Sequence, residues 1–208
     1  MTEFYLVQHG EKAAGVEDPP LTKRGIVQAE CTARFLRDRQ IDLLLSSPAR
    51  RARETAAYLA DQLGLPINID RRLRERMEWR GDFTQQSSAA FLREWERATT
   101  ERDFRTRSGD SSYSAGARFH AALEDLALTQ TDKRIALITH GGVTLDLLRN
   151  LFGDSHLGFL SPGLIAAGPS GCAITHLRRI GGKYMLVALC STEHITGSER
   201  TRYPEGPE

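Results

Sequence analysis

FYLVQHGEK, residues 4–12, joins four consecutive apolar residues to a glutamine, a histidine and a glycine. A continuous apolar run of this length is typical of a parallel strand that is covered on both faces, whereas a half-exposed strand alternates apolar and polar residues. We therefore predict a buried strand over residues 3–8. The histidine follows that strand directly, at the edge where open α/β sheets bind their ligands.

Two other apolar segments, residues 41–46 (IDLLLS) and 134–139 (RIALIT), predict strands of the same kind. Each of these three strands precedes a segment with helical features, and the helices are expected at residues 22–38, 47–64 and 143–152. Thr22 and Ser47 are the expected N-caps of the first two helices, and Pro48 suits the first turn of the second. Further helices are predicted at 87–98 and 115–128, a short strand at 67–69, and a hairpin around Gly181-Gly182. The order predicts an α/β fold, a three-layer αβα sandwich with a mainly parallel central sheet.

We assign residues 1–195 to a single domain, because no long linker interrupts the pattern. The helical segment at about 76–130 is expected to be an insertion that covers the pocket. Residues 196–208 contain two prolines and two glycines, and we expect a flexible tail there.

The composition is that of an ordinary soluble protein: 208 residues, 40% hydrophobic, with a net charge of +1. Nucleic-acid and membrane-surface binders use excess positive charge, so this balance argues against both. No apolar stretch approaches the roughly 20 residues of a membrane span, and the N-terminus lacks a signal-peptide pattern. Three scattered cysteines fit a reducing compartment, and we expect a cytoplasmic location. The sequence leaves the oligomeric state open.

Three polar groups follow three of the predicted strands, so the fold brings them to one sheet edge. They are His9, the arginine cluster at residues 50–53, and His140. Arginine and helix N-termini both favour phosphate as the ligand. A neutral histidine in such a pocket can attack phosphorus, and Gly10 lets the chain turn sharply beside it. Glu75 and Glu78 are the candidate acids for the leaving oxygen.

Five motifs resemble, in the same order, those of the histidine phosphatase superfamily, which includes the phosphoglycerate mutases and many phosphatases. They are LVQHGE (6–11), PLTKRGIVQAE (20–30), SSPARRARETA (46–56), LRER (73–76) and ITHGG (138–142). Each motif alone is weak, but together they extend over about two-thirds of the chain.

This resemblance implies a phosphomonoester hydrolase that works through a phosphohistidine on His9. It implies that Arg51 and His140 bind the phosphoryl group, and that Glu75 is the general acid and then the base that activates water. Gly10 and Gly141, which follow the two histidines, belong to the expected substrate-binding residues. No metal or cofactor is implied, and the six histidines show no close-spaced ligand pattern.

Gln8 departs from the family pattern, which has an arginine before the histidine. Hydrogen bonds to charged groups contribute about 1.5–3 kcal/mol, so losing the charge costs roughly 10- to 150-fold in binding of the phosphoryl group. Either a nearby cation replaces it, with Lys12, Arg50 and Arg76 as candidates, or the site is weakened. We favour replacement, and expect Gln8 and Lys12 both to contact the substrate.

Two alternatives to a phosphatase stay open. The neutral Gln8 is the reason to consider a binding protein that holds a phosphate or a phosphoprotein without turnover. A phosphoglycerate mutase is the second, although the chain is short for one. The substrate is either a phosphorylated small molecule or a phosphoprotein, and the sequence does not distinguish them.

Overall fold

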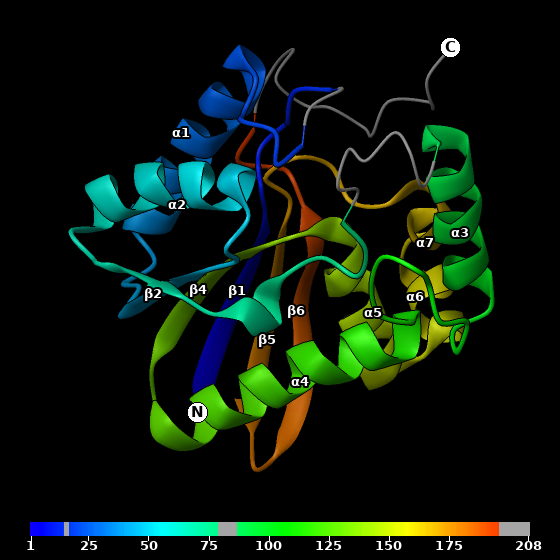
Figure 1. Ribbon diagram of the computed structural model, residues 1–208. Helices are drawn as coiled ribbons and strands as arrows, with labels where there is room; N and C mark the ends of the chain where they lie inside the picture. Colours follow the sequence, from blue (N-terminus) through cyan, green and yellow to red (C-terminus); the bar gives the residue numbers. More distant parts are fainter. Residues whose placement is uncertain (15–16, 79–86, 196–208) are drawn as a thin grey trace.

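The computed structural model describes residues 1–14, 17–78 and 87–195 (Figure 1). Its centre is a six-stranded sheet in the order β3-β2-β4-β1-β5-β6. The strands are β1 (Thr2–Gln8), β2 (Leu43–Ser46), β3 (Ile67–Ile69), β4 (Arg134–Thr139), β5 (Ile174–Ile180) and β6 (Lys183–Ser191). The first four strands are parallel, and β5 and β6 form an antiparallel hairpin beside β1.

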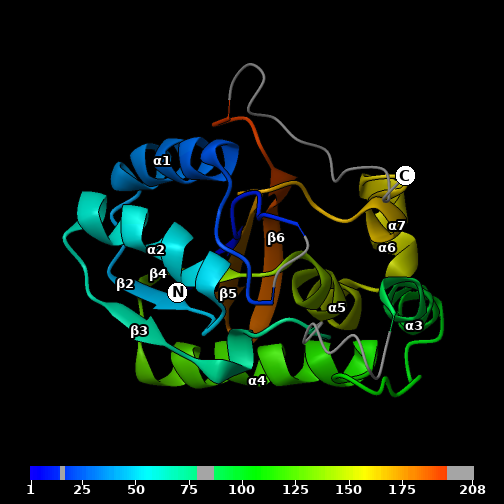
Figure 2. The ribbon, with the colours of Figure 1, turned by 45° about the horizontal axis from the view of Figure 1, so that its top comes forward.

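Helices cover both faces of this sheet, which gives three layers (Figure 2). The helices are α1 (Lys23–Arg37), α2 (Arg50–Leu63), α3 (Ser88–Thr100), α4 (Ser112–Thr129), α5 (Gly141–Phe152), α6 (Asp154–Leu160) and α7 (Leu164–Ala167). One face packs against α1 and α2, and the other packs against α4 and α5. The predicted αβα sandwich with a mainly parallel sheet is confirmed.

Strand β1, which was predicted from the apolar run at residues 4–7, lies at the centre of both hydrophobic cores. Phe4 and Leu6 point into the core with α4 and α5, whereas Tyr5 and Val7 point into the core with α1 and α2. All seven residues of β1 are buried. Burial on both faces is the physical reason why this strand is continuously apolar.

The N-cap predicted from the sequence is correct for α1 and wrong for α2. Thr22 caps α1 as expected, because its side chain accepts a hydrogen bond from Gly25 N at 3.0 Å. Ser47 was expected to cap α2, but the helix begins at Arg50 with Ala49 in the capping position and no side-chain cap. The Ser47 hydroxyl instead lies 2.7 Å from His140 Nε2, so it is committed to the cluster of polar groups at the sheet edge.

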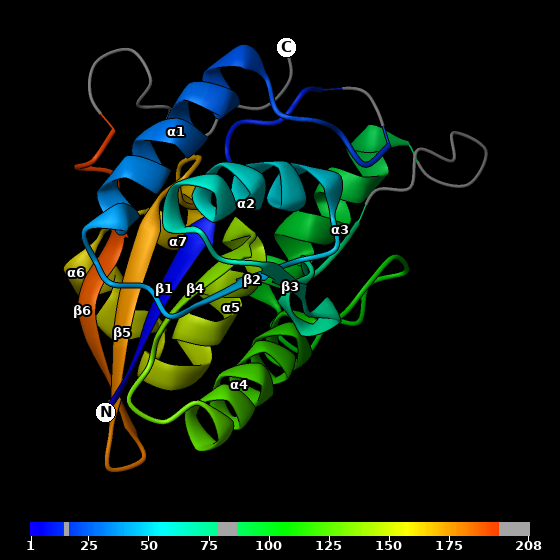
Figure 3. The ribbon, with the colours of Figure 1, turned by 90° about the vertical axis from the view of Figure 1, so that its left-hand side faces the viewer.

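The segment at about 76–130 was expected to cover the pocket. Its helix α4 lies along one face of the sheet (Figure 3). Phe119 and Leu123 of this helix pack into the core on that face. Residues 79–86 of the segment lie outside the described residues. The tail over residues 196–208 lies outside the described residues and stays a prediction.

The loop after β1 packs against the first turn of α1 with no room for side chains. A Cβ on Gly10 would lie 2.5 Å from Gly25 O, and a Cβ on Gly25 would lie 2.1 Å from Glu11 O. Both contacts are with backbone atoms, which cannot turn aside as a flexible side chain can. The glycine of PLTKRGIVQAE therefore sets how closely α1 approaches the loop that carries His9.

Gly25→Ala is expected to lower the free energy of unfolding by about 1–3 kcal/mol, because the added methyl group forces the loop and α1 apart. Urea denaturation measures this change. Gly158→Ala is the matched control, because a Cβ at Gly158 on the surface of α6 meets no atom within 4 Å. Equal stability of Gly25→Ala and the wild type would show that this contact is not tight.

Candidate active site

His9 stands at the carboxyl end of β1 and is 4% exposed. Its Nδ1 lies 2.7 Å from Gly10 O, and since a carbonyl only accepts, the hydrogen bonds assign the ring proton to Nδ1. Nε2 keeps its lone pair, and Arg51 Nε donates to it at 3.1 Å. Burial, followed by the charges of Arg51 and Lys12, lowers the pKa of His9 to about 3. The ring is therefore a neutral, oriented nitrogen base.

His140 follows β4, begins α5 and is fully buried. Its Nδ1 accepts from Arg51 Nη2 at 3.0 Å, so its proton is assigned to Nε2, which donates to Ser47 Oγ at 2.7 Å. Burial, followed by the charge of Arg51, lowers the pKa of His140 well below its ordinary value. The two imidazole rings meet edge to face, with centroids 5.1 Å apart.

Arg51 joins the two histidines. Its single guanidinium donates to the free ring nitrogen of each one, from the first turn of α2. Among the described residues, no carboxylate forms an ion pair with it. A cation that no carboxylate neutralises, held between two polar rings, is suited to an anionic ligand such as a phosphoryl group.

Thr55 and Gln28, for which the sequence predicts no role, hold the loop after His9. Gly10 N donates to Thr55 Oγ1 at 3.0 Å, and that hydroxyl donates to Arg51 O at 2.8 Å. Glu11 N donates to Gln28 Oε1 at 2.8 Å. Thr55 is four residues after Arg51, so helical spacing alone places the two on one face of α2. The contact of Gln28 depends on how α1 packs against the loop, and a local sequence pattern cannot predict that packing.

Glu75 lies beside His140 at the N-terminus of α5. Its Oε2 accepts from Gly142 N at 3.0 Å, and its Oε1 accepts from Val143 N and Arg76 N, each at 2.7 Å. The carboxylate is therefore fixed in orientation. This corrects the expectation that the first N–H groups of α5 point at a phosphate, because a carboxylate of the chain occupies two of them.

Helix α2 shows the same feature. Arg50 N donates to Asp18 Oδ1 at 2.7 Å, so its first N–H group is also occupied by a carboxylate of the chain. The alternative acid, Glu78, is placed by a backbone hydrogen bond to Ser108 O at 3.4 Å. No hydrogen bond or ion pair of its carboxylate occurs within the described residues, whereas Glu75 reaches the residues next to His140.

Gln8 is buried between the two histidine loops, with 4% of its surface exposed. Its Oε1 has no hydrogen-bond partner among the described residues. A Cβ on Gly141 would lie 2.6 Å from this oxygen and 3.0 Å from Pro169, so Gly141 leaves the room that the carboxamide occupies. The side chain thus reaches the sheet edge where the resemblance places an arginine.

Of the three cations proposed to replace that arginine, two are engaged elsewhere. Arg50 pairs with Glu54 at 2.7 Å, and the buried Arg76 pairs with Asp146 at 3.0 Å. Lys12 remains. Lys12 is exposed at the surface. Partial desolvation and the charge of Arg51 lower its pKa, and its own charge lowers the pKa of both His9 and His140.

Helix α3 reaches the same region through Trp95. A Cβ on Gly142 would lie 2.5 Å from the Trp95 ring and 2.7 Å from Glu75 Oε1, so indole and carboxylate converge on this glycine. The Arg76 guanidinium stacks over the Trp95 ring, with its central carbon 4.1 Å from the ring centre. The amphipathic pattern of residues 87–98 predicted the helix but not this contact.

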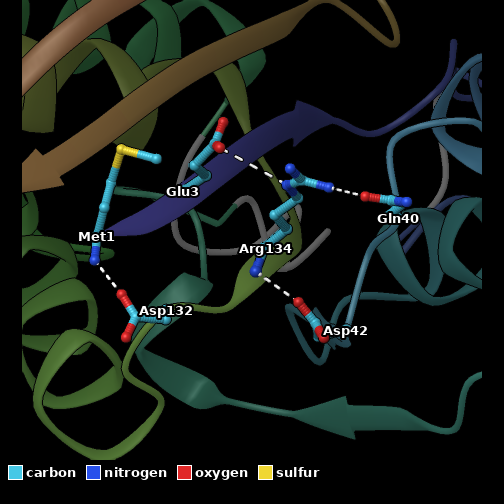
Figure 4. A pocket seen from close by; sticks show the side chains of 6 residues that line it. All are labelled: Met1, Glu3, Gln40, Asp42, Asp132 and Arg134. Carbon is cyan, nitrogen blue, oxygen red and sulfur yellow. Dashed lines mark hydrogen bonds and ion pairs between the residues drawn. The ribbon is translucent and has the colours of Figure 1, made fainter.

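A surface hollow lies at the opposite edge of the sheet, away from the histidines (Figure 4). Its lining residues are Met1, Glu3, Gln40, Asp42, Asp132 and Arg134. These groups pair with one another, as in the contact of Arg134 with Glu3 at 3.6 Å. Within the described residues, no group of histidine, cysteine or acidic side chains is arranged to hold a metal ion, and no helix is long and apolar enough to cross a membrane.

The family model of the histidine phosphatase superfamily (branch 1) matches residues 4–192. The chain belongs to this superfamily. The Yersinia pestis (strain Pestoides F) protein named "Probable phosphoglycerate mutase GpmB" is 32% identical over 163 residues, which are 74% of this chain and 76% of that protein. The family that the five motifs indicated is confirmed.

Solved structures of the superfamily share the fold. A mycobacterial glucosyl-3-phosphoglycerate phosphatase in complex with inorganic phosphate has a TM-score of 0.73 at 22% identity, over 93% of this chain and 99% of that one. An Entamoeba histolytica phosphoserine phosphatase in complex with 3-phosphoglyceric acid also has a TM-score of 0.73 at 22% identity, over 94% and 100%. Together with the family match, these relatives support an enzyme of the phosphatase or mutase type.

The low pKa of His9 predicts a pH dependence of stability. In the unfolded chain the ring returns to a pKa near 6.5, so the unfolded state binds more protons than the folded state between about pH 6.5 and 3. The neutral ring therefore makes its full contribution to the free energy of unfolding above about pH 6.5, and this contribution is lost as the pH falls toward 3. Near pH 5, the wild-type free energy of unfolding should therefore fall with pH more steeply than that of His9→Asn, by about 1.4 kcal/mol per pH unit.

Urea titrations at several pH values give the two slopes, and nitrogen NMR of the histidine rings gives the protonation state directly. The NMR spectrum should show the proton on Nδ1 of His9 at neutral pH. Parallel slopes, or a His9 ring that titrates near pH 6.5 in the folded protein, would contradict the assignment.

Proposed function

We propose that the chain is a phosphomonoester hydrolase that works through a phosphohistidine on His9. The observation that carries the proposal is the Arg51 guanidinium, which donates to His9 Nε2 at 3.1 Å and to His140 Nδ1 at 3.0 Å without a carboxylate partner among the described residues. A phosphoryl group seated on this cation lies next to a neutral ring nitrogen with a lone pair. The proposed nucleophile, His9, and the proposed anion-binding group, Arg51, can thus contact the same phosphoryl group.

The first step of the proposed reaction transfers the phosphoryl group. The N–H groups of Arg51 turn to phosphoryl oxygens, which frees His9 Nε2 to attack phosphorus. The phosphorus–oxygen bond of the ester breaks, and Glu75 gives a proton to the leaving oxygen. Within the described part of the chain, Oε2 of Glu75 accepts one N–H bond, which leaves a lone pair on which that proton can sit.

The second step returns the enzyme to its starting state. Glu75, now ionised, takes a proton from water, and the water oxygen attacks the phosphorus of the phosphohistidine. The phosphorus–nitrogen bond breaks, inorganic phosphate leaves, and the His9 ring is neutral again. The negative phosphoryl group favours a proton on His140 Nδ1, which would make that ring a donor to it.

Gln8, Gly10, Lys12 and Gly141 complete the proposed substrate-binding residues. We propose a phosphorylated small molecule or a phosphoprotein as the substrate, and a cytoplasmic location, which the free thiols of Cys31, Cys172 and Cys190 support. The mutase name of the Yersinia relative favours one alternative. A mutase would return the phosphoryl group to a phosphoglycerate, whereas a hydrolase releases phosphate to water.

His9→Ala is expected to lower kcat/KM for an aryl phosphate by about 10⁴-fold or more, because loss of a nucleophile removes the covalent route. Acid-labile radioactive phosphate should be trapped on the wild type after rapid quenching and be absent from the variant. A wild type that binds phosphate but turns over no ester would overturn the hydrolase proposal. It would instead favour the binding protein that Gln8 suggests.

Lys12→Met is expected to lower kcat/KM roughly 10- to 150-fold, because we propose that Lys12 replaces the charge that Gln8 lacks. Gln8→Arg should then change kcat/KM by less than about threefold, since the cation is already supplied. Lys23→Met, which removes an exposed lysine from the first turn of α1, is the control. The reverse result, a large gain in Gln8→Arg with an inert Lys12→Met, would show that the charge is not replaced.

A further inference from the structure

Arg118 of α4 clasps the backbone of the segment that carries Glu75. Its Nη1 donates to the carbonyl oxygens of Arg72 and Arg74, the latter at 3.1 Å, and its Nη2 donates to Glu75 O at 3.3 Å. The side chain is 13% exposed. Three carbonyl groups of residues 72–75 thus converge on one guanidinium, an arrangement that lysine cannot reproduce because its ammonium is a point charge.

Asp110 holds this guanidinium in place from the loop before α4. Its Oδ2 accepts from Arg118 Nε at 3.0 Å and from Arg74 Nη2 at 2.8 Å. The neighbouring Gly109 packs so closely that a Cβ there would lie 2.0 Å from Arg76 O. Residues Gly109, Asp110 and Arg118, which we call the brace, therefore contact both sides of Glu75 in the sequence.

The brace determines where the Glu75 backbone lies, and α5 determines where its carboxylate lies. The carboxylate accepts from Gly142 N and Val143 N, directly after His140. These contacts require the Glu75 backbone at a fixed distance from α5. One other anchor, Thr139 Oγ1 donating to Leu73 O at 2.8 Å, holds the segment at its start. The brace holds it at Glu75 itself.

We propose that Arg118 is a positioning residue of the phosphatase reaction, and that it acts by holding Glu75 where the leaving oxygen is protonated. This inference rests on the proposed function of Glu75. Arg118 bonds to backbone carbonyls and to Asp110, and it reaches the reaction through Glu75. A loose brace lets the carboxylate leave its place on α5, and a displacement of about 1 Å is enough to cost roughly 100-fold in rate.

The test compares kcat/KM for two esters, p-nitrophenyl phosphate, whose leaving group needs no proton, and an alkyl phosphate, whose leaving group does. In Arg118→Met and Arg118→Lys, the value for the alkyl ester should fall about 10- to 100-fold, and that for the aryl ester less than about threefold. Glu75→Gln should show the same selectivity. In the double variant Glu75→Gln/Arg118→Met the losses should not multiply, because both act on one proton transfer.

Arg179→Met is the matched control. Arg179 also binds α4, through Nε and Nη2 to Glu124 at 2.9 and 2.7 Å, but it makes no hydrogen bond to residues 72–75. It should leave the ratio of the two kcat/KM values unchanged. Asp110→Asn keeps Arg118 and removes the charge of the carboxylate that pairs with it and with Arg74. It tests the same clasp if the Arg118 variants do not fold, and it should shift the ratio in the same direction.

The outcomes distinguish the proposed role of Glu75 as the acid from the proposed role of Arg118 in positioning it. If Glu75→Gln slows both esters equally, Glu75 is not the acid, and the proposed function loses that residue. If Glu75→Gln is selective for the alkyl ester but the Arg118 and Asp110 variants slow both esters equally, the positioning inference is wrong while the proposed function stands. A selective loss in all of them supports both.

Discussion

The structure of the site depends on one guanidinium that lies between two buried, neutral histidines. Arg51 donates to the free nitrogen of each ring, and its charge lowers the pKa of both. Burial has the same effect and is the larger cause in each case. Because both effects favour the neutral ring, His9 keeps a ring nitrogen with a lone pair beside a positive charge.

Most of the surrounding hydrogen bonds hold these three groups in their places. The proton of His9 is assigned by Gly10 O, that of His140 by Ser47, and the loop after β1 is tied to α2 through Thr55. N–H groups at the starts of α2 and α5 donate hydrogen bonds to carboxylates of the chain. The positive ends of these two helices therefore orient Asp18 and Glu75, and the cations of side chains are left to bind an anion.

The position of Glu75 shows how a distant part of the chain enters the site. Residues 72–75 begin within a single 3₁₀ turn at Arg71–Leu73. They lie between β4, α5 and α4, because Thr139 of β4, a backbone N–H group of α5 and Arg118 of α4 bind them. Helix α4 packs under the sheet and also supplies Arg118. A helix that belongs to the hydrophobic core can thus fix the orientation of a proposed catalytic carboxylate.

The sequence by itself determined the layered fold, the family and the places of His9, Arg51 and His140. Buried parallel strands are continuously apolar, and residues that follow such strands must meet at one sheet edge, so local patterns contain this information. Only the tertiary structure decided that Ser47 binds His140 and does not cap α2, that Arg76 is paired with Asp146, and that Arg118 clasps the Glu75 segment. These contacts join residues that are distant in the sequence, and their geometry arises from the packing of whole helices, which no short motif records.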